Sequence, residues 1–216
     1  MTTDPAMVLP LDVLTGIFLL ACRLQFADPG MLNEFFTLWA ISEVSRTWRN
    51  IALSTPLLWS IITLRSLVQM NSESAKRWLS YSVECPLTLD LLLPSIFFKY
   101  DPFPALRPHL PRVRELTVAR PFDIPGDSPL TSLEYLNLVW HSHNAKEGAP
   151  EGVELKRLRG LLEDAPRLRA IRVTTNFLPV FKLASTKLVE LNLSLQVPVT
   201  ELYEFLSACP DLTVLN

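Results

Sequence analysis

The sequence predicts a protein of mixed α and β class (α+β or α/β), in which a small helical module precedes a solenoid of short parallel strands. Three observations lead to this prediction. Apolar residues recur at helical spacing in two blocks before residue 60. After residue 112, a six-residue motif with apolar residues at its first, fourth and sixth positions occurs four times. The chain also contains 18 Pro and only 6 Gly, which favours many short elements that stop abruptly.

The composition allows a sizeable apolar core and carries no strong charge. Of the 216 residues, 49% are hydrophobic, and the formal net charge is −2 at pH 7. This balance gives no bulk attraction to nucleic acid or to an anionic membrane. The apolar run 7–22 contains Pro10 and Asp12, lacks a preceding basic residue, and is shorter than the roughly 20 residues of a membrane span. We therefore expect a cytoplasmic or nuclear protein with no nucleic-acid or membrane partner.

The first predicted helix opens at Leu9-Pro10. Pro10 suits the first helical position, where its missing N–H costs nothing, and Asp12 complements the helix dipole from the first turn. Few polar residues follow before Arg23, so the apolar stripe is wider than a small monomeric bundle can cover. The stripe comprises Leu11, Leu14, Phe18 and Cys22, widened by Ile17 and Leu20. This surplus of apolar surface predicts a partner.

A second helical block is predicted from Met31 onward. It ends at Ser54-Thr55-Pro56, because the residue before a proline disfavours helix. A short apolar turn at 57–59 then closes the module before the β-rich stretch 61–64. The residues expected on the apolar face of this block are Ile41, Val44, Trp48 and Ile51. Those expected on the polar face are Ser42, Glu43, Ser45, Arg46, Arg49 and Asn50.

These two blocks, residues 8–64, resemble an F-box in the form common among mushroom-type fungi. The stretch 54–59 is the most family-like part. Two features depart from the pattern: the long segment 22–38, where shorter F-boxes have a tighter turn, and Ser45, where many members have Cys. The residues that carry the resemblance are Leu9, Pro10, Leu14, Ile17, Phe18, Val44, Arg46, Trp48, Arg49, Ala52, Pro56 and Trp59.

The resemblance implies a partner, the Skp adaptor, and through it a cullin–RING ubiquitin ligase. Seven residues fall on positions that build the adaptor interface or its support: Leu9, Pro10, Leu14, Ile17, Phe18, Val44 and Trp48. Apolar anchors in a desolvated patch are what hold such interfaces together. The alternative is that these residues form an internal core against the C-terminal region. For Trp48 and Trp59 both interpretations stay open.

The second half, residues 75–216, is predicted to be a repeat region. Three of the four spacings between successive motifs fall within the 20–29 residues of leucine-rich repeats, and the longer interval holds an extra polar loop at 141–152. Stacked repeats would bury a continuous ladder of leucines. The region resembles an irregular leucine-rich repeat, a frequent companion of F-boxes in the same family. The motifs occupy 113–118, 133–138, 168–173 and 188–193, and a fifth begins at Leu212.

Further elements are predicted around these motifs. Residues 75–83 are expected to form a helix, and 87–91 a strand that pairs with the first repeat. Helical returns are expected at 153–164 and 200–208. The chain stops inside a repeat without a polar cap, so we expect a truncated solenoid or an end that a partner covers.

The strand residues between the buried leucines are predicted to point outward on a concave face, where a target protein would bind. The alternative is a strand face that is merely solvated. The residues in question are Glu115, Thr117, Tyr135, Asn137, Arg172, Thr174, Glu190 and Asn192.

Catalytic chemistry finds little support in the sequence. His141 and His143 have no third ligand at recognisable spacing, so a solvated loop is favoured over a metal site. No Gly-rich phosphate loop and no nucleophile elbow is present. We expect no enzyme, no cofactor and no metal. The three cysteines, which lack metal or redox spacing and are expected to be free thiols in a reducing compartment, are Cys22, Cys85 and Cys209.

The function that these patterns favour is the substrate receptor of a Skp–cullin–F-box ubiquitin ligase, with an unknown target protein. The first alternative is a repeat-based interaction scaffold whose F-box-like segment is its N-terminal cap. A weaker alternative is a metal-dependent hydrolase that uses the loop histidines.

Overall fold

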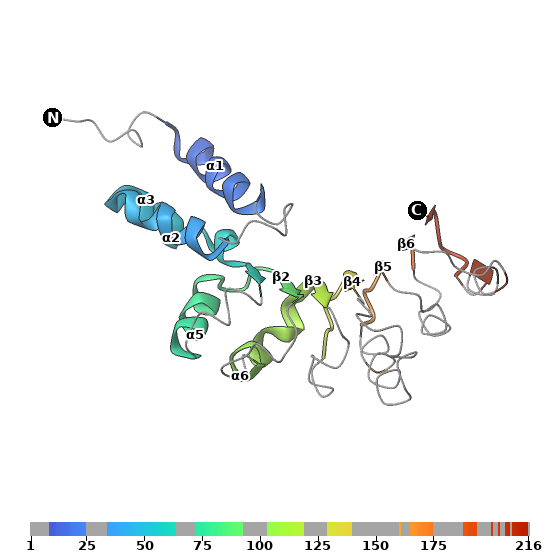
Figure 1. The fold of residues 1–216 in the computed structure, drawn as a ribbon. Coiled ribbons are helices and arrows are strands. Elements are labelled where there is room, and N and C mark those ends of the chain that lie inside the picture. The colour runs from blue at the N-terminus through green and yellow to red at the C-terminus, as the bar shows by residue number, and fades with distance from the viewer. Residues whose placement is uncertain are drawn as a thin grey trace, which may run out of the picture. The chain divides into compact units, whose positions relative to one another are not determined.

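The computed structural model divides the chain into two compact units, Met1–Cys85 and Pro86–Asn216, which we call the N-terminal and C-terminal units (Figure 1). The helix predicted at 75–83 belongs to the N-terminal unit, although the repeat region was expected to begin at residue 75. The structure describes residues 9–24, 34–63, 72–92, 103–118, 129–139, 160, 165–174, 188–193, 200, 203, 206–207 and 209–215.

The N-terminal unit is mainly helical. Its elements are α1 (Leu11–Leu24), α2 (Glu34–Val44), α3 (Arg46–Leu53), the 3₁₀ helix η2 (Pro56–Trp59), β1 (Ile61–Thr63) and α5 (Ser72–Tyr81). Helix α1 begins one residue later than predicted, so Pro10 lies just before it, and the Pro10 carbonyl accepts the Leu14 N–H at 3.1 Å. The predicted apolar turn at 57–59 is confirmed as part of η2, with Leu58 and Trp59 buried.

The second helical block is two helices, not one, because the chain breaks at Ser45. Ser45 is extended (φ −157°, ψ 169°), and its hydroxyl oxygen accepts the Trp48 N–H at 3.2 Å, which caps α3. The break resets the helical phase, so two predictions of facing are wrong. Val44 is 59% exposed rather than on the buried face, and Ser42 is buried, with its Oγ donating to the Leu38 carbonyl at 2.8 Å.

Aromatic packing closes the core of the N-terminal unit. Trp59 is buried, and its Nε1–H donates to the Ala52 carbonyl at 2.8 Å. Its ring centroid lies 4.9 Å from that of Trp78 and 4.7 Å from that of Tyr81, both on α5. Trp59, which the sequence left open between a partner surface and internal packing, therefore serves the core of its own unit.

The C-terminal unit contains strands in chain order with short connecting elements. They are β2 (Leu87–Leu91), α6 (Phe103–Leu106), the 3₁₀ helix η4 (Arg107–Arg112), β3 (Val113–Val118), β4 (Tyr135–Val139), β5 (Ala170–Thr174), β6 (Glu190–Leu193) and β7 (Val214–Leu215). In the sheet, the strands of this unit lie in the order β2-β3-β4-β5-β6-β7. Every pairing from β2 to β7 is parallel. The predicted class, mixed helix and strand with short parallel strands, is thus confirmed at this level.

Each predicted motif places one strand, and the strand predicted at 87–91 pairs with the first of them. The middle apolar residue of each strand lies opposite its counterpart in the next strand. These buried residues are Leu89, Leu116, Leu136, Ile171 and Leu191. Leu215 of β7 continues the row but is 46% exposed.

The entry to each strand repeats the same backbone hydrogen bonds. A tight turn precedes Leu133, Leu168 and Leu212, whose N–H groups donate to the carbonyl three residues earlier at 3.0–3.2 Å. The next residue then donates to the preceding strand's entry: Glu134 to Arg114, Arg169 to Glu134, Val189 to Arg169 and Thr213 to Val189, at 2.7–2.9 Å.

The predicted helical returns fall largely outside the described residues. Gly160 is helical within the first, and Thr200, Tyr203, Leu206 and Ser207 are helical within the second. The loop that carries His141 and His143 also lies outside them. None of the described helices has the length and apolarity that crossing a membrane requires.

Candidate binding surfaces

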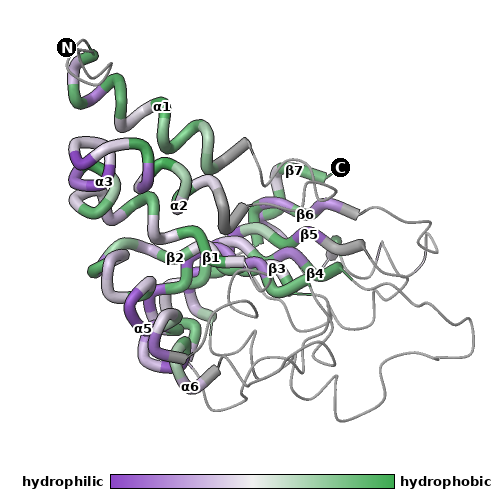
Figure 2. Tube along the Cα trace, turned by 60° about the vertical axis from the view of Figure 1, so that its left-hand side comes forward, coloured by the Kyte–Doolittle hydropathy of each residue, from purple (hydrophilic) through white to green (hydrophobic). Residues whose placement is uncertain are grey.

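Helix α1 divides its apolar residues between the interior of its unit and the solvent. Leu14 and Phe18 are buried, and the Phe18 ring packs against Trp48 of α3. Val13, Ile17 and Leu20 follow one another at intervals of four and three residues, so they share another face of the helix. Figure 2 shows hydrophobic residues along most of α1. We call the exposed set the α1 surface: Leu9, Leu11, Val13, Ile17 and Leu20, of which Leu11 (64%) and Leu20 (58%) are the most exposed.

Trp48 of α3 packs against α1. Its ring lies 4.8 Å from the Phe18 ring at an interplanar angle of 51°, and the residue is half-buried. Its Nε1 is buried and has no hydrogen-bond partner within the described part of the chain. A buried indole N–H without an acceptor costs free energy, about 1–3 kcal/mol, so Trp48 is held here by its packing on Phe18.

The seven residues predicted for adaptor binding therefore separate into two groups. Leu9, Pro10, Ile17 and Val44 are exposed, whereas Leu14, Phe18 and Trp48 lie in or against the core of the unit. The predicted set does not include Leu11, Val13 and Leu20, which are also exposed and apolar. The width of the apolar stripe was the signal that could have found them.

Cys22 lies on α1, and its thiol is weakly reactive. Burial raises the pKa of its thiol to about 11, so the thiol is protonated at neutral pH and is a poor nucleophile. Burial also raises the pKa of Cys209. Cys22, Cys85 and Cys209 form no disulfide with any residue that the structure describes.

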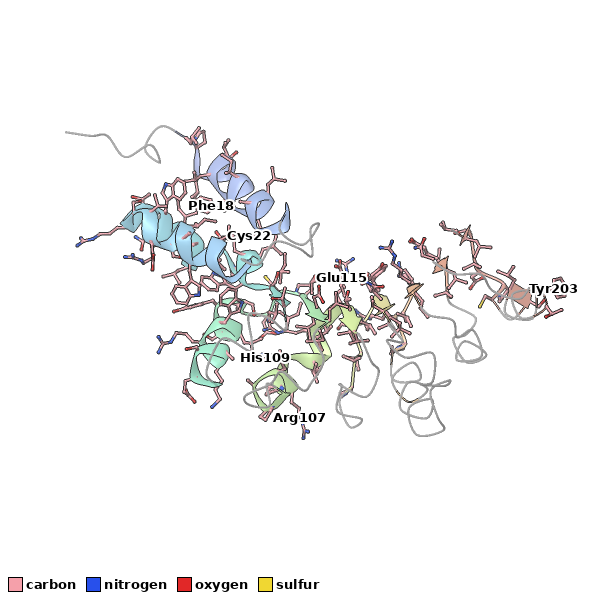
Figure 3. The ribbon with its side chains drawn as sticks, in the orientation of Figure 1. Phe18, Cys22, Arg107, His109, Glu115 and Tyr203 are labelled. Atoms are coloured by element: carbon pink, nitrogen blue, oxygen red, sulfur yellow. The ribbon has the colours of Figure 1, made fainter. Side chains whose placement is uncertain are left out.

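The face of the parallel sheet opposite the leucine row carries polar side chains in register, as Figure 3 shows for Glu115, which lies on the other side of the strands from Arg107 and His109. We call this the polar face. Its first row is Thr88, Glu115, Tyr135, Ala170 and Glu190, and its second row is Asp90, Thr117, Asn137, Arg172 and Asn192. Glu115 and Arg172 are exposed, and the remaining members of both rows are partly exposed.

Hydrogen bonds on the polar face hold two of its carboxylates in place. The Thr88 hydroxyl donates to Glu115 Oε2 at 3.3 Å, and the Asn192 amide donates to Glu190 Oε1 at 2.7 Å. Neither glutamate forms an ion pair with any other residue that the structure describes. On the polar face, the hydrogen-bond donors to both carboxylates are thus neutral side chains.

Tyr135 and Arg172 interact at the centre of the polar face. Burial raises the pKa of the Tyr135 hydroxyl, a hydrogen bond with Arg172 opposes this, and the charges of Glu190 and Glu115 add to the rise. The phenol thus stays neutral within reach of one guanidinium and two carboxylates. Next to them in the second row, Asn137 Oδ1 is buried and accepts no hydrogen bond from any described residue.

The structure brings together seven of the eight residues predicted for target binding. Glu115, Tyr135 and Glu190 share the first row, and the second row contains Thr117, Asn137, Arg172 and Asn192. Thr174 pairs with Val139 in register, while its side chain lies outside what the structure describes. The sequence did not predict the ion pair between Arg114 Nη2 and Glu134 Oε2, 2.9 Å apart, at the strand entries.

Within the described residues, no group of three or more His, Cys, Asp or Glu side chains could hold a metal ion. His109 lies in η4. A hydrolase that uses His141 and His143 stays a prediction that the described residues do not test.

Comparison with known proteins adds no relative to this picture. No protein-family model matches the chain, and no curated protein matches its sequence. The fold and the two surfaces therefore carry the functional argument.

Proposed function

We propose that the protein is an F-box-type substrate receptor, which docks on the Skp adaptor of a cullin–RING ubiquitin ligase through its N-terminal unit. One observation carries the proposal: α1 exposes an apolar face although its unit already has a closed core. Leu14, Phe18 and Trp59 fill that core, so Leu11, Val13, Ile17 and Leu20 are left over. Apolar side chains of this size at a protein surface are typical anchors of a stable interface.

The C-terminal unit would hold the target protein. We infer an irregular leucine-rich-repeat solenoid from the strand-entry hydrogen bonds, which recur from one motif to the next, and from the row of buried leucines. In such a solenoid the polar face is the surface offered to a target. Its partly exposed aromatic and charged side chains suit protein recognition better than a small-molecule reaction.

The mechanism would be positional, and the chain itself would do no chemistry. Holding a target beside the ligase-bound conjugating enzyme turns ubiquitin transfer into an event at high effective concentration. The receptor then needs two independent surfaces, one for the adaptor and one for the target. The α1 surface and the polar face belong to different units and meet that requirement.

Co-purification with an Skp adaptor tests the proposal. We expect a stoichiometric complex with the wild-type chain, and a loss of affinity of at least about 30-fold for Ile17→Asp with Leu20→Asp, because hot-spot side chains each contribute about 2 kcal/mol or more. Val83→Asp is the matched control, since Val83 is an equally exposed apolar residue of the same unit outside α1. Circular dichroism of each variant checks that the unit stays folded.

A wild-type chain that ignores the adaptor would overturn the proposal and favour the repeat-based scaffold. Leu14→Asp or Phe18→Asp is unsuitable for this test, because both side chains are buried and the unit would unfold.

A further inference from the structure

We propose that the polar face binds a basic segment of a partner protein, with a Lys or Arg side chain lying over Ala170 between Tyr135 and Glu190. The inference rests on the proposed function, because the segment would belong to the target, and it names the chemistry of that target. Three independent features of the described residues support it: net charge, a gap in one row, and spare hydrogen-bonding capacity.

Charge complementarity is the first support. The ionic residues of the polar face are three carboxylates, Asp90, Glu115 and Glu190, and one guanidinium, Arg172. Arg172 is engaged with the Tyr135 hydroxyl, whereas Glu115 and Glu190 receive hydrogen bonds from neutral side chains. A cationic ligand would find two carboxylates with no ion-pair partner among the described residues, and an anionic ligand would meet repulsion.

The shape of the first row is the second support. Ala170 pairs with Tyr135 on one side and with Glu190 on the other. Neighbouring strands are about 4.8 Å apart, so the backbones of Tyr135 and Glu190 are about 10 Å apart, and the row residue between them, Ala170, contributes only a methyl group. A single long side chain fits between them. There its cation would approach the Glu190 carboxylate and the face of the Tyr135 ring, an arrangement that stabilises Lys and Arg.

Spare hydrogen-bonding capacity is the third support. Asn137 lies directly beside Arg172 and Thr117 in the second row. Its buried Oδ1 accepts no hydrogen bond from the described residues. An acceptor left over two residues from Tyr135, on the same strand, matches a ligand that is rich in N–H donors, as Lys and Arg side chains are.

Peptide binding to the full-length chain tests the inference. The probes are a short fluorescein-labelled peptide of alternating Lys and Ser and a matched peptide of alternating Glu and Ser, followed by fluorescence anisotropy. We expect the Lys peptide to bind and the Glu peptide not to bind, with affinity falling as salt increases. The double variant Glu115→Gln, Glu190→Gln should weaken binding about tenfold or more.

Three further variants separate the site from bulk charge. Glu73→Gln removes an exposed carboxylate on α5 of the N-terminal unit, which is not a residue of the polar face, and should leave binding unchanged. Ala170→Leu fills the gap without changing charge and should weaken binding. Arg172→Gln removes the one cation and should tighten binding of the Lys peptide. Preference for the Glu peptide, no binding of either peptide, or equal losses for Glu73→Gln and the double variant would each overturn the inference.

The outcome is separable from that of the proposed function. The Glu115→Gln, Glu190→Gln variant should still co-purify with the Skp adaptor, because neither residue belongs to the α1 surface. Peptide binding without adaptor binding would leave the basic-segment inference standing and refute only the ligase role.

Discussion

Both units of this protein bury an apolar core, but they leave opposite kinds of surface exposed. In the C-terminal unit, strand alternation sends leucines to one side and polar residues to the other, so the polar face is almost free of apolar side chains. In the N-terminal unit, α1 is apolar on more than one face, and no rotation of the helix can hide all of them. The period of two in a strand separates apolar from polar residues cleanly, whereas the helical period leaves several apolar residues of α1 exposed at the surface of their unit.

Replacing Phe18 with Ala should have the largest effect on stability, and it tests the core of the N-terminal unit. Phe18 is buried against Trp48, and such a truncation costs about 3–5 kcal/mol of stability. Urea denaturation measures the loss, and iodoacetamide labelling of Cys22 localises it, because burial keeps that thiol protonated in the folded unit. Ile17→Ala, on the α1 surface, is the control and should shift stability by at most about 0.5 kcal/mol.

A matched pair of leucines sharpens the comparison on the C-terminal side. Leu136 and Leu215 occupy equivalent positions in the leucine row, but Leu136 is fully buried and Leu215 is 46% exposed. We expect Leu136→Ala to lower the free energy of unfolding by about 2–5 kcal/mol, and Leu215→Ala by less than about 1 kcal/mol. Equal losses from the two changes would mean that the row does not form a continuous core.

Removing the cap at Ser45 should have an intermediate effect. Ser45→Ala deletes the acceptor of the Trp48 N–H and should destabilise the N-terminal unit by about 1 kcal/mol. Ser45→Asp keeps an acceptor at the same position and should retain most of the stability. If α2 and α3 were one continuous helix, Ala would instead be the more stable residue, because its helix propensity is the higher.

A substitution at Val83 should increase the stability of the N-terminal unit. It adopts φ +46°, a left-handed conformation that is unfavourable for a β-branched residue, and its side chain is 57% exposed. Val83→Gly should relieve this strain and raise the free energy of unfolding by about 0.5–1 kcal/mol, after the entropic cost of glycine. Thermal unfolding measures the shift, and a lower melting temperature would contradict the assigned backbone conformation.

The smallest expected effect is a pH dependence of the N-terminal unit. Burial raises the pKa of Cys22 from 9.0 to about 11. Above pH 9 the unfolded chain therefore releases this proton while the folded unit retains it, so stability falls as pH increases from 9 towards 11. Denaturation curves at pH 8 and pH 10 should differ more for the wild type than for Cys22→Ala.

The sequence predicted the C-terminal strands better than the N-terminal helices, for a physical reason. Each L-x-x-L-x-L motif specifies its own strand, and the motifs repeat, so errors do not accumulate along the chain. The helical break at Ser45 was missed because Ser is acceptable within a helix as well as at its start. The phase of the second block then shifted, which misplaced Ser42 and Val44.

The residues of the polar face could be predicted from the sequence more fully than those of the α1 surface. The outward positions of Glu115, Tyr135 and Asn137 follow from strand alternation, but the gap at Ala170 needed the register between β4, β5 and β6. On α1, spacing alone could not decide which of its many apolar residues, Leu14 or Leu11 for example, would turn inward. That choice depends on where α2 and α3 pack.

The same hydrogen bonds form at the strand entries whether the chain between two strands is short or long. Arg169 donates to Glu134 at 2.9 Å and Thr213 donates to Val189 at 2.9 Å, although more residues separate the first pair than the second. Closing a longer connection costs little, about 0.6 kcal/mol for each doubling of its length. Insertions between strands can therefore accumulate and diversify while the spacing of the polar-face residues stays constant.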